Sequence, residues 1–123
     1  MLLDTNIVIH ACQTGGAALQ AWTRHPDAAI ASVTRIEALG FARISRAEES
    51  AIRTYVDASL TYPLDEDVIE RAITLRQQKK MKLGDAIIAA TALEYDLPLV
   101  TRNEADFKHI TGLALINPFK PAS

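Results

Sequence analysis

The sequence has little of what disulfide-bonded, zinc-binding or membrane proteins need. Its 123 residues include one cysteine, Cys12, which excludes a disulfide framework and a zinc finger or ribbon. The three histidines, His10, His25 and His109, are scattered and lack zinc-ligand spacing. No apolar run approaches the ~18 residues of a membrane span, and no basic n-region opens the chain. We therefore expect no signal peptide, no membrane association and a cytoplasmic setting.

An excess of positive charge is also missing. The 13 Lys and Arg residues against 15 Asp and Glu residues give a formal net charge of -2. This balance argues against a protein that holds nucleic acid by bulk positive charge, but it allows an enzyme that meets a nucleic acid locally. Because cysteines and clustered histidines are lacking, the chemistry must come from carboxylates, hydroxyls or amides.

Hydrophobic residues make up 49% of the chain, which predicts one globular domain over residues 1–123. Short β-rich runs alternate with helical patterns. Strands are expected at residues 1–4, 28–31, 60–64, 97–101 and 113–116. Helices are expected at 5–13, 17–23, 33–44, 45–58, 65–80 and 83–95, with a helical turn at 103–109. Ser45 and Glu48 have the spacing of a capping box at the start of the fourth helix, and the nearly all-apolar helix at 83–95 is expected to be buried on most sides. This alternation predicts a three-layer α/β/α fold whose parallel sheet has four to five strands, with ligands bound beyond the carboxyl ends of the strands.

Two aspartates lie at the junctions where such a sheet binds ligands. Asp4 ends the first strand and precedes a helix, so it is either a helix N-cap or a member of a site. Asp85 follows Gly84 and opens an apolar helix. It could cap that helix, but the cap would then lie in a covered place, and Gly84 leaves room for another group to approach the backbone.

Glu37 and Asp106 complete the set of candidate acids. Glu37 lies four residues from both Val33 and Phe41, which predicts a carboxylate on a core-facing helical stripe that needs a cation or strong donors. The alternative is a glutamate at the edge of the stripe, paired with an arginine such as Arg35 or Arg43. Asp106 follows the strand at 97–101, and from the residues alone Glu104 competes with it.

Four carboxylates on separate elements together indicate one acidic pocket. Carboxylates packed together repel one another, and without a cation some would be protonated. Oxygen ligands suit Mg²⁺ or Mn²⁺, which also bind phosphate oxygens. The chemistry that follows is metal-assisted hydrolysis of a phosphodiester.

Four segments in series resemble the PIN-domain ribonucleases, and among these the VapC-type toxins of bacterial toxin–antitoxin pairs. They are residues 3–6 (LDTN), 34–39 (TRIEAL), 84–92 (GDAIIAATA) and 99–107 (LVTRNEADF). The resemblance implies a parallel sheet flanked by helices and acids that bind Mg²⁺ or Mn²⁺ for RNA cleavage. The implied catalytic and metal-binding acids are Asp4, Glu37, Asp85 and Asp106, which ranks Asp106 above Glu104.

The resemblance also implies neighbours for these acids and partners for the chain. Thr5, Asn6, Thr101 and Asn103 match polar positions beside the acids, where they would orient ligands or water. VapC-type toxins are usually homodimers, and a cognate antitoxin blocks the site with a C-terminal segment. The region between Glu37 and Asp85 is compact, which leaves the choice of RNA substrate open.

A basic cluster precedes the third acid and consists of Arg76, Lys79, Lys80 and Lys82. Basic residues at a helix end fit the helix dipole without any function. The cluster nevertheless leads directly to the acids, so Lys79, Lys80 and Lys82, together with Arg102, are the candidate contacts to RNA phosphates.

Two other classes of protein fit these features less well. Aspartyl-phosphate phosphatases need a second Asp two residues after the first, where this chain has Asn6, and signalling receiver domains have no good match around Asp57. A PIN-like module that binds RNA or protein without cutting remains the alternative. The intact set of acids argues against it.

Overall fold

The computed structural model describes residues 1–13 and 16–120. Its five parallel strands form one sheet in the order β3-β2-β1-β4-β5, so the predicted parallel sheet of four to five strands is confirmed. In the register of the central strands, Leu2 pairs with Ala29 on one side and with Leu99 on the other. The strands are β1 (Leu2–Leu3), β2 (Ala29–Ala31), β3 (Leu60–Tyr62), β4 (Leu99–Val100) and β5 (Leu115–Ile116).

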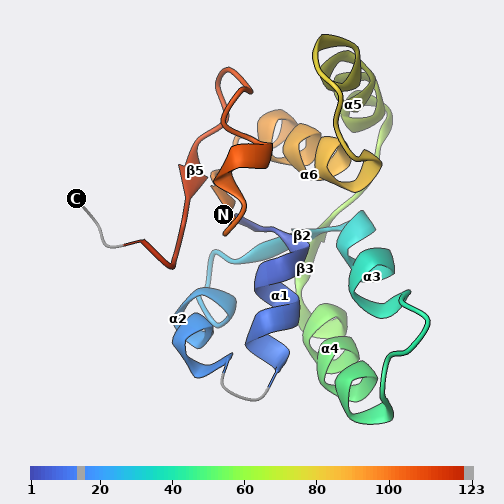
Figure 1. The fold of residues 1–123 in the computed structure, drawn as a ribbon, viewed down its shortest axis with the longest axis vertical. Coiled ribbons are helices and arrows are strands. Elements are labelled where there is room, and N and C mark those ends of the chain that lie inside the picture. Colours follow the sequence, from blue (N-terminus) through green and yellow to red (C-terminus); the bar gives the residue numbers. More distant parts are fainter. Residues whose placement is uncertain (14–15, 121–123) are drawn as a thin grey trace.

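Helices cover both faces of the sheet, which confirms the predicted three-layer arrangement. Helices α1 to α4 lie on one side of the strands in Figure 1, and α5 and α6 lie on the other. Over residues 1–13 and 16–120, no helix is long and apolar enough to cross a membrane. The helices are α1 (Thr5–Cys12), η1 (Gly16–Leu19), α2 (Gln20–Thr23), α3 (Ser32–Leu39), α4 (Arg46–Ala58), α5 (Glu66–Gln78), α6 (Leu83–Glu94) and η2 (Glu104–Asp106), where η denotes a 3₁₀ helix.

Alternation along the strands divides the apolar residues between two cores. Leu2 and Leu99 belong to the core under α5 and α6. Leu3 and Val100 belong to the core under α1, α3 and α4, because successive side chains of a strand point to opposite faces. The predicted burial of the apolar helix is confirmed, since seven consecutive residues of α6, 86–92, are buried.

Local capping explains where the helices begin and end. Ser45 and Glu48 form the capping box expected at the start of α4, and the Asp65 carboxylate accepts a hydrogen bond from the Val68 amide (2.9 Å) at the start of α5. The helix expected over 33–44 is wrong in length, because α3 ends at Leu39. Gly40 caps it through its amide, which donates to the Ile36 carbonyl (2.7 Å), and glycine is a poor residue for extending a helix.

The remaining boundary differences are small. The helix expected over 17–23 is divided between η1 and α2, and the turn expected over 103–109 is the short 3₁₀ helix η2. More important for the site is the pairing of Leu3 with Val100, which places the residues that follow them, Asp4 and Thr101, at the same carboxyl edge of the sheet.

Candidate acidic site

Asp4 lies between β1 and α1 and is almost fully buried, with 4% of its surface exposed. Its Oδ1 accepts a hydrogen bond from the Thr5 amide and its Oδ2 accepts one from the Thr101 hydroxyl, each at 2.8 Å. Burial raises the pKa of Asp4; the bonds from Thr101 and Thr5 oppose the rise, and the charges of Glu37 and Asp106 add to it. Asp4 therefore caps α1, and its carboxylate is also repelled by the charges of Glu37 and Asp106.

The structure corrects the reason for selecting Glu37. This residue is exposed rather than core-facing. The apolar stripe that placed it in the core does not form, since Val33 is only half-buried and Phe41 lies beyond the end of α3. The arginine alternative does not hold for Arg35, whose guanidinium pairs with Asp57 at 3.6 Å.

Contacts with two other elements define the position of the Glu37 carboxylate. Its Oε1 accepts a hydrogen bond from the Thr5 hydroxyl of α1 (2.7 Å). Its Oε2 lies so close to Gly84 of α6 that a Cβ atom on residue 84 would collide with it. The sequence-based inference that Gly84 leaves room for an approaching group is therefore confirmed, and that group is Glu37.

Thr34 is a residue of this site that the sequence analysis missed. Its buried hydroxyl lies 3.0 Å from the hydroxyl of Thr5. Because the Thr5 proton is directed to Glu37, Thr34 donates to Thr5, and the two threonines form a relay that ends on the carboxylate. A signal was present in the sequence, since Thr34 lies one turn before the buried Ala38 on α3.

Asp85 is the third residue of α6, not its cap. The N-cap is Lys82, which makes no side-chain capping bond. Burial raises the pKa of Asp85 to about 6, and the charges of Asp4, Asp106 and Glu37 contribute, against a smaller opposing effect of Lys82. Asp85 thus lies within the electrostatic reach of all three other candidate acids.

Asp106 and Glu104 both belong to η2, but they face different surroundings. Glu104 accepts from the Lys120 ammonium (2.5 Å) and from the Asn117 amide (3.2 Å), and these bonds lower its pKa. Asp106 is exposed, and its charge raises the pKa of Asp4 and of Asp85. The Glu104 carboxylate is therefore bonded to the C-terminal segment, while the Asp106 carboxylate interacts electrostatically with Asp4 and Asp85.

The polar neighbours expected from sequence differ in how they are placed. Thr5 and Thr101 bond directly to acids, and the Thr101 hydroxyl also accepts from the Asn103 amide (3.0 Å). Asn6 is exposed, and over the described residues no hydrogen bond joins it to an acid. Arg102 lies over the Phe119 ring, with its guanidinium carbon 4.7 Å from the ring centroid, so it is directed to the C-terminal segment.

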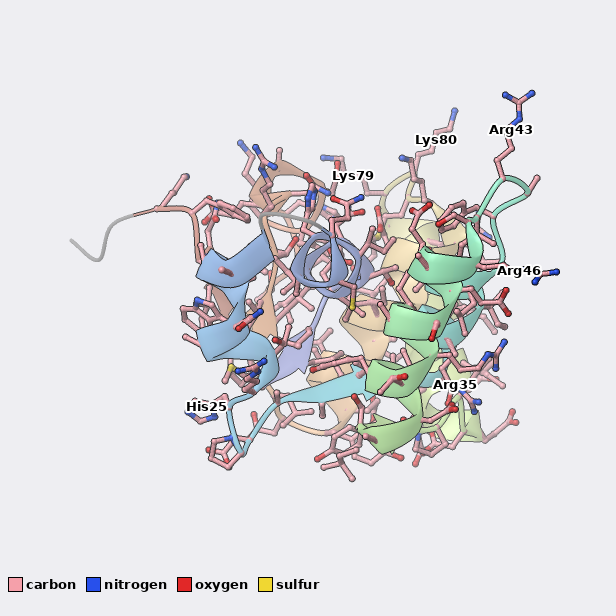
Figure 2. The ribbon with its side chains drawn as sticks, turned by 90° about the horizontal axis from the view of Figure 1, so that it is seen from below. His25, Arg35, Arg43, Arg46, Lys79 and Lys80 are labelled. Atoms are coloured by element: carbon pink, nitrogen blue, oxygen red, sulfur yellow. The ribbon has the colours of Figure 1, made fainter. Side chains whose placement is uncertain are left out.

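A pocket of about 390 Å³ adjoins Asp85 and Asp106. The three lysines of the basic cluster line it, and Figure 2 shows Lys79 and Lys80 along the same edge of the molecule as Arg43, away from His25. A larger pocket of about 650 Å³, which includes His25, is lined by no acidic residue. The smaller pocket is therefore the one that belongs to the acids.

His109 also lines the smaller pocket, although in the sequence it stood out only as a histidine without zinc-ligand spacing. Both of its ring nitrogens are buried, and neither has a hydrogen-bond partner in the described part of the chain. Nothing in the sequence signals this, because a lone histidine in a loop has no periodic pattern.

Comparison with known proteins identifies the family. The model of the PIN domain matches residues 1–113. The chain belongs to the PIN-domain family. It is 29% identical to the protein named Ribonuclease VapC of Rickettsia bellii, with 94% of each chain covered. This confirms the resemblance to VapC-type ribonucleases.

Solved structures agree with this PIN-domain assignment. A toxin–antitoxin complex from Klebsiella pneumoniae contains a chain that is 36% identical, with 98% of each chain covered and a TM-score of 0.77. VapBC2 from Rickettsia felis, bound to a DNA fragment from its promoter, is 21% identical with a TM-score of 0.77, covering 94% of this chain and 96% of that one, and it shows the fold alone.

In this PIN domain the charges of neighbouring acids add to the rise that burial causes in the pKa of Asp4 and Asp85, but the four carboxylates are not gathered around one point. Over residues 1–13 and 16–120, no three His, Cys, Asp or Glu side chains are close enough to hold one metal ion as they are placed. Mg²⁺ commonly keeps several waters and takes only one or two carboxylates directly. An all-oxygen donor set in which burial and mutual repulsion raise the pKa of Asp4 and Asp85 fits such a hydrated cation.

Proposed function

We propose that this PIN domain is a Mg²⁺- or Mn²⁺-dependent endoribonuclease and the toxin of a toxin–antitoxin pair. The observation that carries the proposal is the convergence of acidic charge on Asp85, where burial and then the charges of Asp4, Asp106 and Glu37 raise the pKa to about 6. The names of the relatives, Ribonuclease VapC among them, support the reaction class.

In this proposal Asp4, Glu37, Asp85 and Asp106 are the residues that hold the metal. The bound ion would activate water and stabilise the leaving oxygen of the phosphodiester. The chain's own hydroxyls orient the ligands: Thr101 holds one oxygen of Asp4, and Thr5 holds one oxygen of Glu37.

The lysine-lined pocket is the proposed place for the RNA backbone. Lys79, Lys80 and Lys82 are exposed around Asp85, where they can neutralise phosphates next to the acids. Arg102 remains a candidate contact, although its guanidinium stacks on Phe119.

Two protein partners belong to the proposal. A cognate antitoxin is supported by the neighbour from Klebsiella pneumoniae, which is a toxin–antitoxin complex. A homodimer is expected of the chain without its antitoxin. Analytical ultracentrifugation of the purified chain, alone and with its antitoxin, tests both.

The decisive experiment is cleavage of a panel of single-stranded RNAs by the antitoxin-free protein. We expect cleavage with Mg²⁺ or Mn²⁺, none with EDTA, and a loss in Asp4→Asn and Asp85→Asn of at least the ~10- to 100-fold caused by changes to a metal ligand's outer-shell partners. Asp27→Asn, an exposed acid beside His25, is the control and should cut normally. An uncut panel with both metals would favour the non-cleaving module instead.

A further inference from the structure

Residues 117–120, here called the C-terminal clasp, dock on the loop that carries Asp106. The Lys120 ammonium lies 2.5 Å from a Glu104 carboxylate oxygen, and the Asn117 side-chain amide donates to the same oxygen at 3.2 Å. The clasp is itself folded, because the Asn117 side chain accepts from the Phe119 amide (2.9 Å) and the Asn117 carbonyl accepts from the Lys120 amide (3.2 Å).

The clasp makes a second contact two residues before Glu104. Phe119 packs under the Arg102 guanidinium at 4.7 Å, and the Asn117 side chain lies 3.5 Å from the Arg102 carbonyl. The clasp therefore contacts residue 102 through its carbonyl and guanidinium and residue 104 through its carboxylate. The clasp also lies beyond residues 1–113, the part of the chain that matches the PIN-domain model.

A series of hydrogen bonds joins Asp106 to Asp4 through Asn103 and Thr101, and Arg102 and Glu104 are the chain neighbours of Asn103. The Asp106 amide donates to the Asn103 carbonyl (3.0 Å), and the Asn103 amide donates to the Thr101 hydroxyl (3.0 Å). That hydroxyl donates to the buried carboxylate of Asp4 (2.8 Å). A shift of residues 102–104 would therefore change the position of Asp106 relative to Asp4.

Helix η2 cannot hold Asp106 in place by itself. It spans only Glu104–Asp106, and so short a 3₁₀ helix has little stability of its own. Over the described residues, no hydrogen bond holds the Asp106 carboxylate. Its position depends on the backbone bond from its amide to Asn103 and on the anchors on either side, which are the buried Phe107 and the contact of Glu104 with the clasp.

We propose that the C-terminal clasp positions Asp106 for metal binding, with Glu104 as the positioning residue. This rests on the proposed function, because it assumes that Asp106 belongs to the metal site. The clasp touches neither metal nor RNA in this proposal; it acts by limiting the motion of residues 102–106.

The test uses variants of the clasp in the full chain. Lys120→Ala removes the ion pair, Lys120→Arg keeps it, and the double variant Asn117→Ala/Lys120→Ala removes both side-chain contacts to Glu104. Arg71→Ala is the matched control, because it breaks a comparable partly exposed ion pair, Arg71 with Glu94 at 2.7 Å, on α5 and α6.

Two measurements are made on each variant: hydrogen exchange of the Asn103 and Asp106 amides without metal, and Mn²⁺ affinity by electron paramagnetic resonance. An exposed ion pair contributes little, so we expect Mn²⁺ to bind about threefold more weakly to Lys120→Ala and about tenfold more weakly to the double variant. The two amides should exchange faster in both. Lys120→Arg and Arg71→Ala should match the unaltered protein.

Unchanged exchange of both amides in the double variant overturns the inference, and so does faster exchange with unchanged Mn²⁺ affinity. If the unaltered protein binds no Mn²⁺, the proposed function fails. The exchange data then still decide whether the clasp restrains the loop.

Discussion

Asp4 and Asp85 are held in the candidate site by opposite means. Asp4 is buried and accepts hydrogen bonds from Thr5 and Thr101, which offset part of the rise that burial causes in its pKa. Asp85 is half-buried, and in the described part of the chain no hydrogen bond holds its carboxylate. Only the charge of Lys82 opposes the rise in its pKa to about 6.

This difference indicates that the fold itself fixes the Asp4 carboxylate, whereas the Asp85 carboxylate would be fixed by a bound ligand. Asp4 contributes to the stability of the β1–α1 junction whether or not a cation is present, since its carboxylate satisfies two donors. Asp85 is repelled by three other acids, and the charge of Lys82 is the one opposing effect, so a cation would relieve this repulsion. The three predictions below disturb one side of the site at a time.

The largest effect is expected from Gly84→Ala, which disturbs the Asp85 side. The added Cβ would collide with the Glu37 carboxylate, so that side chain has to leave its place beside α6. We expect cleavage to fall by at least the ~10- to 100-fold typical of a displaced ligand partner, measured as kcat/KM on a susceptible RNA. The melting temperature should change little, because the displaced atoms are the end of a flexible chain.

A second change checks the cause of the Gly84→Ala effect. Adding Glu37→Asp shortens the side chain by one methylene and relieves its collision with the new Cβ of residue 84. The double variant should therefore bind Mn²⁺ more tightly than Gly84→Ala alone. Normal cleavage by Gly84→Ala would show that Glu37 does not need this position.

An intermediate effect is expected from Thr101→Val, which disturbs the Asp4 side. The change keeps the shape but removes the donor to Asp4 and the acceptor for the Asn103 amide, and leaving buried polar groups unpaired costs about 1–3 kcal/mol of unfolding free energy. The pKa of Asp4 should rise further, because this bond lowers it.

Urea unfolding measures the cost of Thr101→Val. The control is Thr54→Val on α4, whose exposed hydroxyl donates to the Ser50 carbonyl, and it should change stability by less than about 0.5 kcal/mol. Equal effects of the two substitutions would contradict a special role for Thr101.

The smallest effect is expected from Asp85→Asn in metal-free protein. Folding raises the pKa of Asp85 from 3.8 to about 6, so the folded state binds this proton more tightly than the unfolded state does. The charged group therefore destabilises the fold fully above pH 6, and this penalty disappears as the pH falls toward 4. Asp85→Asn should be more stable than the unaltered protein at pH 8 and equal to it below pH 4.

Urea unfolding with EDTA at several pH values measures this difference, which solvent screening keeps small. Asp27→Asn, which replaces an exposed acid away from the site, is the substitution control in the same series. A gain from Asp85→Asn that is the same at pH 8 and pH 4 would contradict the raised pKa.

Much of the fold could be predicted because it follows from short patterns. The Ser45 and Glu48 capping box and the apolar run of α6 both lie where the sequence indicated. Glu37 was selected for an incorrect reason: the helical stripe that predicted its burial assumed a helix to residue 44, whereas α3 ends at Leu39. Its motif identified it nonetheless.

The sequence by itself determined the alternation of strands and helices, the three-layer arrangement and the separate acids, because these depend on periodicity and on nearest neighbours along the chain. The resemblance ranked Asp106 above Glu104, but only the tertiary structure shows what Glu104 contacts, since its partners lie 13 and 16 residues further on at Asn117 and Lys120. The same holds for the Thr101 bond to Asp4, which joins residues 97 apart. A contact of that kind exists only once the strands have paired, so no local pattern records it.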